Sequence, residues 1–214
     1  MKKLDLMIFD FDGTLVATGD DLVNSINHTL KVFHLQEKPK KEIIGYVGDG
    51  VRVLMERCLG RENLQFHEEA MKIFSDYYGK HLLDHTILYP HVEDVLKNFA
   101  DKKKIILTNK RYEFTMMITG GLKIDKYFTE ILGIDSTPFS KPDPRVIGHI
   151  LEKHQSAPEN TLMVGDGSND ILVAQKSRIL SLGLLNGLGN RDDLLKLKAD
   201  YYCEDIVELN SLFI

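Results

Sequence analysis

The sequence predicts a doubly wound α/β fold, in which a Rossmann-like core of parallel strands carries an inserted all-helical cap domain. Short apolar runs recur along the chain and are continuous rather than alternating, which is typical of strands buried on both faces of a parallel sheet. Stretches of helical periodicity separate the later runs, whereas the long segment after the first run is helical throughout.

The expected strands follow one another along the chain. They lie at residues 6–9 (LMIF), 105–107 (IIL), 162–164 (LMV), 179–185 (ILSLGLL) and 201–203 (YYC). Two of the intervening segments place their apolar residues on one helical face. These faces consist of Val92, Val95, Leu96 and Phe99 in the first segment, and of Val146, Ile147, Ile150 and Leu151 in the second.

The helical segment carries three stripes of apolar residues at helical spacing. They are Leu22, Ile26, Leu30 and Phe33; Val51, Leu54, Met55 and Cys58; and Phe66, Ala70, Ile73, Phe74 and Tyr77. We expect no strand between residues 16 and 86. The predicted catalytic core therefore comprises residues 1–15 and 88–214, and the predicted cap comprises residues 16–87, with short linkers near Ala17 and Leu88.

Composition excludes several classes of function. The 214 residues carry a net charge of −5, so the chain has no basic surface of the kind that binds nucleic acid. No apolar run approaches the length of a membrane span, and the acids at positions 5, 10 and 12 interrupt any signal peptide. The two cysteines have no metal-binding spacing. We expect a cytoplasmic protein; the sequence does not indicate its oligomeric state.

Four polar clusters occur at the ends of expected strands or just before a helix. They are Asp10 and Asp12 in "IFDFDGTLV", "LTNK" (107–110), "SKPDP" (140–144) and "GDGSND" (165–170). In open parallel sheets, ligands bind beyond the carboxyl ends of the strands. Within "SKPDP", Asp143 and Pro144 are explained as the start of a helix, which leaves Lys141 without a structural role.

Together the clusters bring hard oxygen ligands and one ammonium group to a single edge of the sheet. The carboxylates of Asp10, Asp12, Asp166 and Asp170 form a set that suits Mg²⁺. A divalent cation on carboxylates beside Lys141 is typical of phosphoryl transfer, where neutralising phosphate oxygens is most of the catalytic task. The residues alone therefore predict a metal-assisted phosphate site.

In their order and spacing, "DFDGTL", "LTNK", "SKPDP" and "GDGSND" resemble the four motifs of the haloacid dehalogenase-like superfamily. The resemblance covers essentially the whole chain, including the helical insertion between the first two motifs. It implies an enzyme, a Mg²⁺-dependent phosphoric monoester hydrolase that acts on a small phosphorylated metabolite. Asp10 resembles the nucleophile that becomes an aspartyl phosphate, and Asp12 resembles the general acid that later activates water.

The same resemblance implies the remaining roles. The Asp10 side chain, the backbone carbonyl of Asp12 and Asp166 would hold Mg²⁺, while Asp170 would support the metal through water or orient Lys141. The residues that would bind the phosphate are Thr108, the backbone of Asn109, and Lys141, which would neutralise the charge shared with Asp10. Gly13 would permit a tight turn that frees backbone N–H groups for the phosphate.

Differences between this sequence and particular members of the superfamily limit the reactions that the chain is expected to catalyse. Asp12 is present, which argues against a dehalogenase, and the stretch "VATGDDLVNS" lacks the early cap histidine of hexose-phosphate mutases. A mutase or phosphotransferase is therefore disfavoured but stays an alternative. A phosphonatase also stays open, because Lys38, Lys40 and Lys41 lie where such enzymes carry a reactive cap lysine.

Among the phosphatases, "TNK" and the cap stretch "GYVGDGVRVLMERCL" are similar to those of the bacterial phosphoglycolate phosphatases. This similarity implies 2-phosphoglycolate as the substrate, with Arg52 or the N–H groups of the "VGDGVR" loop meeting its carboxylate. Pyrophosphate, phosphoserine and a nucleotide are alternative substrates, because "LVAT" replaces the usual "LVDS" and "GDGSND" resembles the phosphoserine phosphatases.

Overall fold

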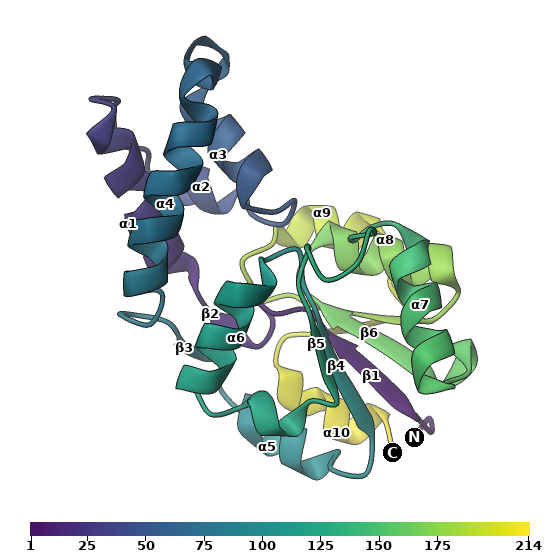
Figure 1. The fold of residues 1–214 in the computed structure, drawn as a ribbon. Coiled ribbons are helices and arrows are strands. Elements are labelled where there is room, and N and C mark those ends of the chain that lie inside the picture. Colours follow the sequence, from purple (N-terminus) through teal and green to yellow (C-terminus); the bar gives the residue numbers. More distant parts are fainter.

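The computed structural model describes all residues from 1 to 214, and its largest element is a six-stranded sheet in the order β5-β4-β1-β6-β7-β8 (Figure 1). Every neighbouring pair in this sheet is parallel. The strands are β1 (Leu6–Phe9), β4 (Lys103–Leu107), β5 (Glu130–Leu132), β6 (Thr161–Gly165), β7 (Leu180–Leu184) and β8 (Tyr201–Cys203). The predicted α/β class and its parallel sheet are therefore confirmed.

Helices cover both faces of the sheet because its strands are apolar on both sides. In β1, Leu6 and Ile8 pack against α7 and α8, while Met7 and Phe9 face the opposite core together with α5 and α6. The core helices are α5 (Val92–Asn98), α6 (Tyr112–Gly121), α7 (Pro144–His154), α8 (Ser168–Ser177), α9 (Arg191–Lys196) and α10 (Leu209–Leu212). As expected, Asp143 caps α7 by accepting a hydrogen bond from the Arg145 N–H, and Pro144 opens the helix.

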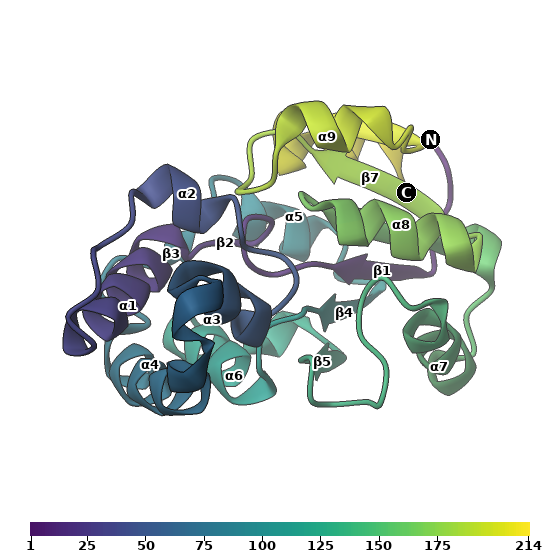
Figure 2. The same cartoon turned by 90° about the horizontal axis from the view of Figure 1, so that it is seen from above.

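A second group of helices lies beyond the carboxyl ends of the strands, toward which β1 points in Figure 2. It contains α1 (Gly19–Val32), α2 (Lys40–Ile44), α3 (Val51–Leu59) and α4 (His67–His81). The apolar stripes expected for this segment supply buried residues of α1, α3 and α4, among them Ile26, Met55 and Phe74. We refer to the residues between β2 and β3 as the helical unit.

The structure corrects the expectation that residues 16–86 hold no strand. β2 (Val16–Ala17) pairs with β3 (Ile87–Leu88) in an antiparallel two-stranded sheet. Its two strands are the chain segments that enter and leave the helical unit, so the two connections lie side by side. Each strand has only two residues, which is too short for a hydrophobic pattern to reveal it. No helix in the structure has the length and apolar character that a membrane span requires.

Candidate active site

The candidate site lies where β1, β4 and β6 end. Asp10 directly follows β1, Thr108 follows β4 and Asp166 follows β6. The direction in which the sheet grows reverses beside β1, because β4 and β5 extend one edge and β6 to β8 extend the other. Such a switch point leaves a crevice at the carboxyl ends of the strands, and that is where doubly wound folds bind their ligands.

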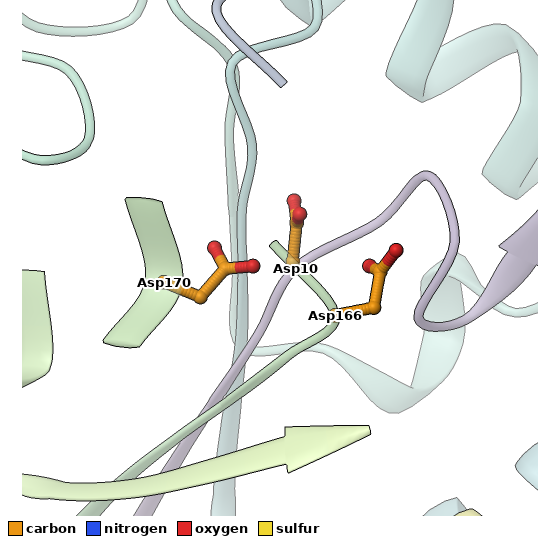
Figure 3. A group of neighbouring side chains, drawn as sticks. All are labelled: Asp10, Asp166 and Asp170. Carbon is orange, nitrogen blue, oxygen red and sulfur yellow. The ribbon is translucent and has the colours of Figure 1, made fainter. Parts of the chain in front are cut away.

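Three predicted residues, Asp10, Asp166 and Asp170, bring their carboxylates together in this crevice. One oxygen from each lies within 4.8 Å of the others, and Figure 3 shows the Asp10 side chain between the other two. Asp10 comes from the end of β1, whereas Asp166 and Asp170 come from the turn and first helical turn between β6 and α8. The side chain of Asp12 is not part of this group.

Asp166 is fixed by neighbours on both of its oxygens. The Thr14 hydroxyl donates to Oδ1 at 2.7 Å, and the backbone N–H groups of Leu188 and Gly189 donate to Oδ2 at 2.8 and 2.9 Å. Gly13 leaves the space for this carboxylate, because it has a φ of +87° and an added Cβ would lie 2.1 Å from Oδ2. The structure thus places Gly13 against Asp166.

Lys141 stands between two of the three acids. Its Nζ lies 2.8 Å from Oδ1 of Asp10 and 2.6 Å from Oδ1 of Asp170. The other oxygen of Asp170 accepts the Gly167 N–H at 2.9 Å, so this acid is fully engaged in orienting Lys141 and the turn. Of the two roles considered for Asp170, these contacts favour the orientation of Lys141.

Burial and the mutual repulsion of the acids shift their pKa values upward. Burial, followed by the charge of Asp170, raises the pKa of Asp10 to about 7, and burial with the charge of Asp10 raises the pKa of Asp166 to about 6. Burial also raises the pKa of Asp170. Burial alone would lower the pKa of Lys141, but the carboxylates of Asp10 and Asp170 outweigh it and raise that pKa.

This donor set fits a divalent cation. Three ionised carboxylates beside a single ammonium leave an excess of negative charge in the crevice, and this charge adds to burial in raising the pKa values of Asp10 and Asp166. Carboxylate oxygens are the ligands that Mg²⁺ takes, usually through one or two carboxylates with water and phosphate completing the shell. Asp10 and Asp166 have the position to hold such an ion.

The Asp12 carboxylate faces the helical unit instead. It accepts a hydrogen bond from the Thr18 hydroxyl at 2.6 Å, and Nζ of Lys110 lies 3.1 Å from its Oδ1. The same ammonium donates to the Tyr78 hydroxyl of α4 at 2.7 Å. Burial raises the pKa of Tyr78 to about 12, so its phenol stays neutral and acts as an acceptor for Lys110. This chain of contacts joins the core to the helical unit.

Asn109 joins the core to the loop before α3. Its Nδ2 donates to the carbonyl of Gly48 at 2.9 Å and to the carbonyl of Lys141 at 3.0 Å. Asn169 also donates to the Gly48 carbonyl, at 3.2 Å, and to Oδ1 of Asp49 at 2.9 Å. The predicted "VGDGVR" loop therefore does point toward the carboxyl ends of the strands.

A cavity of about 60 Å³ lies between these two parts of the chain. Asp10, Asp12, Thr108 and Asn109 line it from the core side. The helical unit contributes mainly apolar side chains and loop backbone: Leu22, Val47, Gly48, Gly50, Val51, Leu54, Phe74 and Tyr78. Lys110, Arg111 and Phe114 complete the lining.

The structure does not bring Arg52 to this cavity. Its guanidinium pairs with Glu68 on the outer side of α3 and α4, and its side chain is 61% exposed. Lys38, Lys40 and Lys41 do not line the cavity either, so no lysine of this segment is placed to form a Schiff base with a bound substrate. Lys40 and Lys41 are exposed, and Lys38 is half-buried and paired with Glu42.

Sequence reasoning missed Lys110 and Tyr78. Lys110 belongs to the recognised "LTNK" segment, but a lysine ordinarily lies on the surface, and only the fold shows that this one is buried. Tyr78 continues the apolar stripe of α4 and was indistinguishable from core residues of the helical unit. A useful indication was available: a lysine directly after a strand-end motif is placed where ligands bind.

Comparison with known proteins agrees with this geometry. A family model described as "Haloacid dehalogenase-like hydrolase" matches residues 7–184. The chain is 34% identical to a phosphoglycolate phosphatase of Psychrobacter arcticus (95% of this chain, 93% of the relative) and 30% identical to one of Pasteurella multocida (99% of both). A crystal structure of a predicted phosphoglycolate phosphatase from Haemophilus somnus superposes with a TM-score of 0.94 at 28% identity, covering 99% of both chains.

Proposed function

The chain belongs to the haloacid dehalogenase-like hydrolase family, and on that premise we propose that it is a Mg²⁺-dependent phosphatase of a small phosphate monoester, with 2-phosphoglycolate as the preferred substrate. The observation that carries the proposal is the convergence of Asp10, Asp166, Asp170 and Lys141 at one edge of the sheet, beside a cavity. We further propose that residues 16–87, which contain the helical unit, form a cap over that cavity.

In the first step, an Asp10 carboxylate oxygen attacks the phosphorus of the ester. The bond between phosphorus and the ester oxygen breaks, and its electron pair stays on that oxygen, which takes a proton from Asp12. The product is a phosphorylated Asp10. Lys141, at 2.8 Å from Asp10, offsets the repulsion between this anion and the phosphate, and a Mg²⁺ held by Asp10 and Asp166 would supply further positive charge.

In the second step, water attacks the phosphorylated Asp10. Asp12, now a carboxylate, accepts a proton from the water, and the bond between phosphorus and the Asp10 oxygen breaks to release phosphate. The Thr18 hydroxyl and the Lys110 ammonium both bond to Asp12, so they hold its carboxylate toward the cavity during both steps. Thr108, at the end of β4, lies where it can donate to a phosphate oxygen.

The size of the cavity supports a small substrate. At about 60 Å³ it is far smaller than the roughly 300–1,000 Å³ of sites for drug-sized ligands, so a nucleotide does not fit this arrangement. Relatives named phosphoglycolate phosphatase, matched over nearly their whole length, support 2-phosphoglycolate among the small esters.

Replacement of Asp10 by Asn tests the mechanism. Asp10→Asn keeps the shape of the side chain but removes the nucleophilic carboxylate, so phosphate release from 2-phosphoglycolate in Mg²⁺ is expected to vanish. The matched control is Asp76→Asn, an exposed acid of α4, which is expected to keep full activity. Activity retained in Asp10→Asn, with a native circular dichroism spectrum, would refute the proposal.

A panel of phosphate esters tests the substrate. Free phosphate is measured with 2-phosphoglycolate, phosphoserine, pyrophosphate and a nucleoside monophosphate, and the highest kcat/KM is expected for 2-phosphoglycolate. A mutase or phosphotransferase would instead move the phosphoryl group between hydroxyls of a sugar phosphate and release little phosphate.

A further inference from the structure

Lys110 is a buried cation that faces the cavity and has unused bonding capacity. Its side chain is 6% exposed, and its partners are the Asp12 carboxylate at 3.1 Å and the Tyr78 hydroxyl at 2.7 Å. An ammonium group carries three N–H donors; the third contact of Lys110, to Oδ2 of Asp12, is the longest at 3.4 Å, so the donor on that side is the one that a ligand oxygen can take. The Tyr78 ring, with its centroid 4.7 Å from Nζ, keeps the ammonium from turning away.

No other cation of the candidate site is both buried and placed to donate a hydrogen bond into the cavity. Lys141 is bonded to both Asp10 and Asp170 and does not line the cavity. Arg111 lines the cavity, but its guanidinium lies over the Phe114 ring at 5.5 Å and its side chain is 39% exposed. Lys110 is therefore the cation that a buried anionic group of a ligand would meet.

The position of Lys110 relative to Asp12 specifies where that anionic group must be. In the proposed first step Asp12 gives its proton to the ester oxygen, which must therefore lie beside the Asp12 carboxylate, and the Lys110 ammonium lies 3.1 Å from that carboxylate. When a carboxylate is attached to the carbon that bears the ester oxygen, its oxygens lie about 3 Å from that ester oxygen, as standard bond lengths require.

We propose that Lys110 is a specificity residue, which binds a leaving-group carboxylate attached to the same carbon as the ester oxygen. This inference rests on the proposed function and deepens it, because it names the substrate class as phosphate esters of small 2-hydroxy acids. Leu22, Leu54 and Phe74 form apolar walls around the cavity, and such walls exclude water and strengthen the bond between the ammonium and the carboxylate.

The test compares two esters of equal length, 2-phosphoglycolate and ethyl phosphate, in the full-length enzyme with Mg²⁺. Lys110→Met removes the ammonium, so the preference for 2-phosphoglycolate, measured as the ratio of the two kcat/KM values, is expected to fall about ten- to hundredfold. Any effect of the substitution on Asp12 changes kcat/KM for both esters by the same factor and therefore cancels in the ratio. If Lys110→Met does not fold, Lys110→Gln serves, because it keeps hydrogen bonds to both partners without the charge.

Two control variants separate this role from others. Thr18→Val weakens the support of Asp12 without touching Lys110, and it is expected to slow both esters equally. Arg111→Met removes the other cation of the cavity lining and is expected to leave the ratio unchanged.

Two outcomes are decisive and distinguishable. A wild-type preference for 2-phosphoglycolate that persists in the Lys110 variants, or that is lost in Arg111→Met instead, would overturn the role of Lys110 alone. A wild-type enzyme that shows no preference between the two esters would overturn the proposed substrate as well.

Discussion

The buried charge of Asp166 lowers the stability of the folded protein, and its carboxylate lies in the candidate site. Three donors fix its carboxylate, yet burial and the neighbouring Asp10 raise its pKa to about 6, which means that its charge is disfavoured where it lies. A divalent cation removes that penalty by pairing with the carboxylates.

Asp166→Asn is therefore expected to raise the melting temperature of the metal-free protein by a few degrees while abolishing phosphatase activity. The amide keeps an oxygen for the N–H groups of Leu188 and Gly189, and its nitrogen can donate to the Thr14 hydroxyl. Added Mg²⁺ is expected to raise the melting temperature of the wild type but not of the variant. Equal shifts in both proteins would show that Asp166 holds no metal.

Asp21 differs from Asp166, because hydrogen bonds stabilise its buried charge. It accepts hydrogen bonds from the backbone N–H groups of His85 and Thr86 and from the Thr86 hydroxyl, and it pairs with the His85 ring at 2.8 Å. Burial alone would raise the pKa of Asp21, but these hydrogen bonds outweigh it and lower that pKa below its ordinary value. The contacts tie α1 to the segment that leads back into β3.

The lowered pKa sets the sign of a pH effect. Because the folded protein holds the Asp21 proton less tightly than the unfolded chain does, the stabilisation is complete above about pH 4 and is lost as pH falls through the folded-state pKa. Asp21→Asn is expected to lower the free energy of unfolding by about 2–3 kcal/mol at pH 7 and by less at pH 3. The neighbouring, exposed Asp20→Asn serves as control and is expected to change it by under about 1 kcal/mol. Urea unfolding at both pH values measures this, and a pH-independent difference would contradict it.

Among the elements, those with several buried apolar residues could be predicted from the sequence. β1 and β6 are continuous apolar runs, which predict buried strands. The apolar residues of α7 lie on one face, and this periodicity predicts a helix. β5 was missed because it is a three-residue edge strand that begins with Glu130, and α2 because it has five residues. The pairing of β2 with β3 depends on contacts between distant segments, which a hydrophobic pattern does not encode.

The loop before α3 is held by two asparagines of the core, which both donate to the carbonyl of Gly48. Asn169→Ala removes one of these bonds and the contact with Asp49, so amide hydrogen exchange in residues 46–51 is expected to accelerate severalfold while the sheet keeps its protection. Asn63→Ala removes a comparable bond to the Leu59 carbonyl within the helical unit and is expected to leave residues 46–51 unaffected. Equal exchange in both variants would show that Asn169 does not hold the loop.

At the scale of the whole molecule, the sequence identified the acids at the strand ends, because the topology of a parallel sheet brings such ends together. It could not identify which cations line the cavity. Arg52 was expected there and lies outside, whereas Lys110 lies inside, because the choice depends on how the helical unit packs against the core.

The arrangement of the two parts predicts a motion. The cavity is small and the loop before α3 is bonded to the core across it, so we expect the helical unit to move away when a substrate enters. The paired β2 and β3 strands are the two connections about which it would turn. Small-angle scattering is expected to show a smaller radius of gyration with Mg²⁺ and a phosphate analogue than without them, and identical profiles would contradict a moving cap.

Transfer of a phosphoryl group to Asp10 is the central step of the proposed reaction. Asp12→Asn removes the group that protonates the leaving oxygen and later activates water. An aryl phosphate such as p-nitrophenyl phosphate leaves without a proton, so a phosphorylated enzyme is expected to accumulate when this variant is mixed with p-nitrophenyl phosphate and Mg²⁺ and quenched in acid. Mass spectrometry of the peptide that contains Asp10 measures it. The account predicts one added phosphoryl group on Asp10; a phosphoryl group on another residue, or turnover in the Asp12→Asn variant at the wild-type rate without any phosphorylated enzyme, would contradict it.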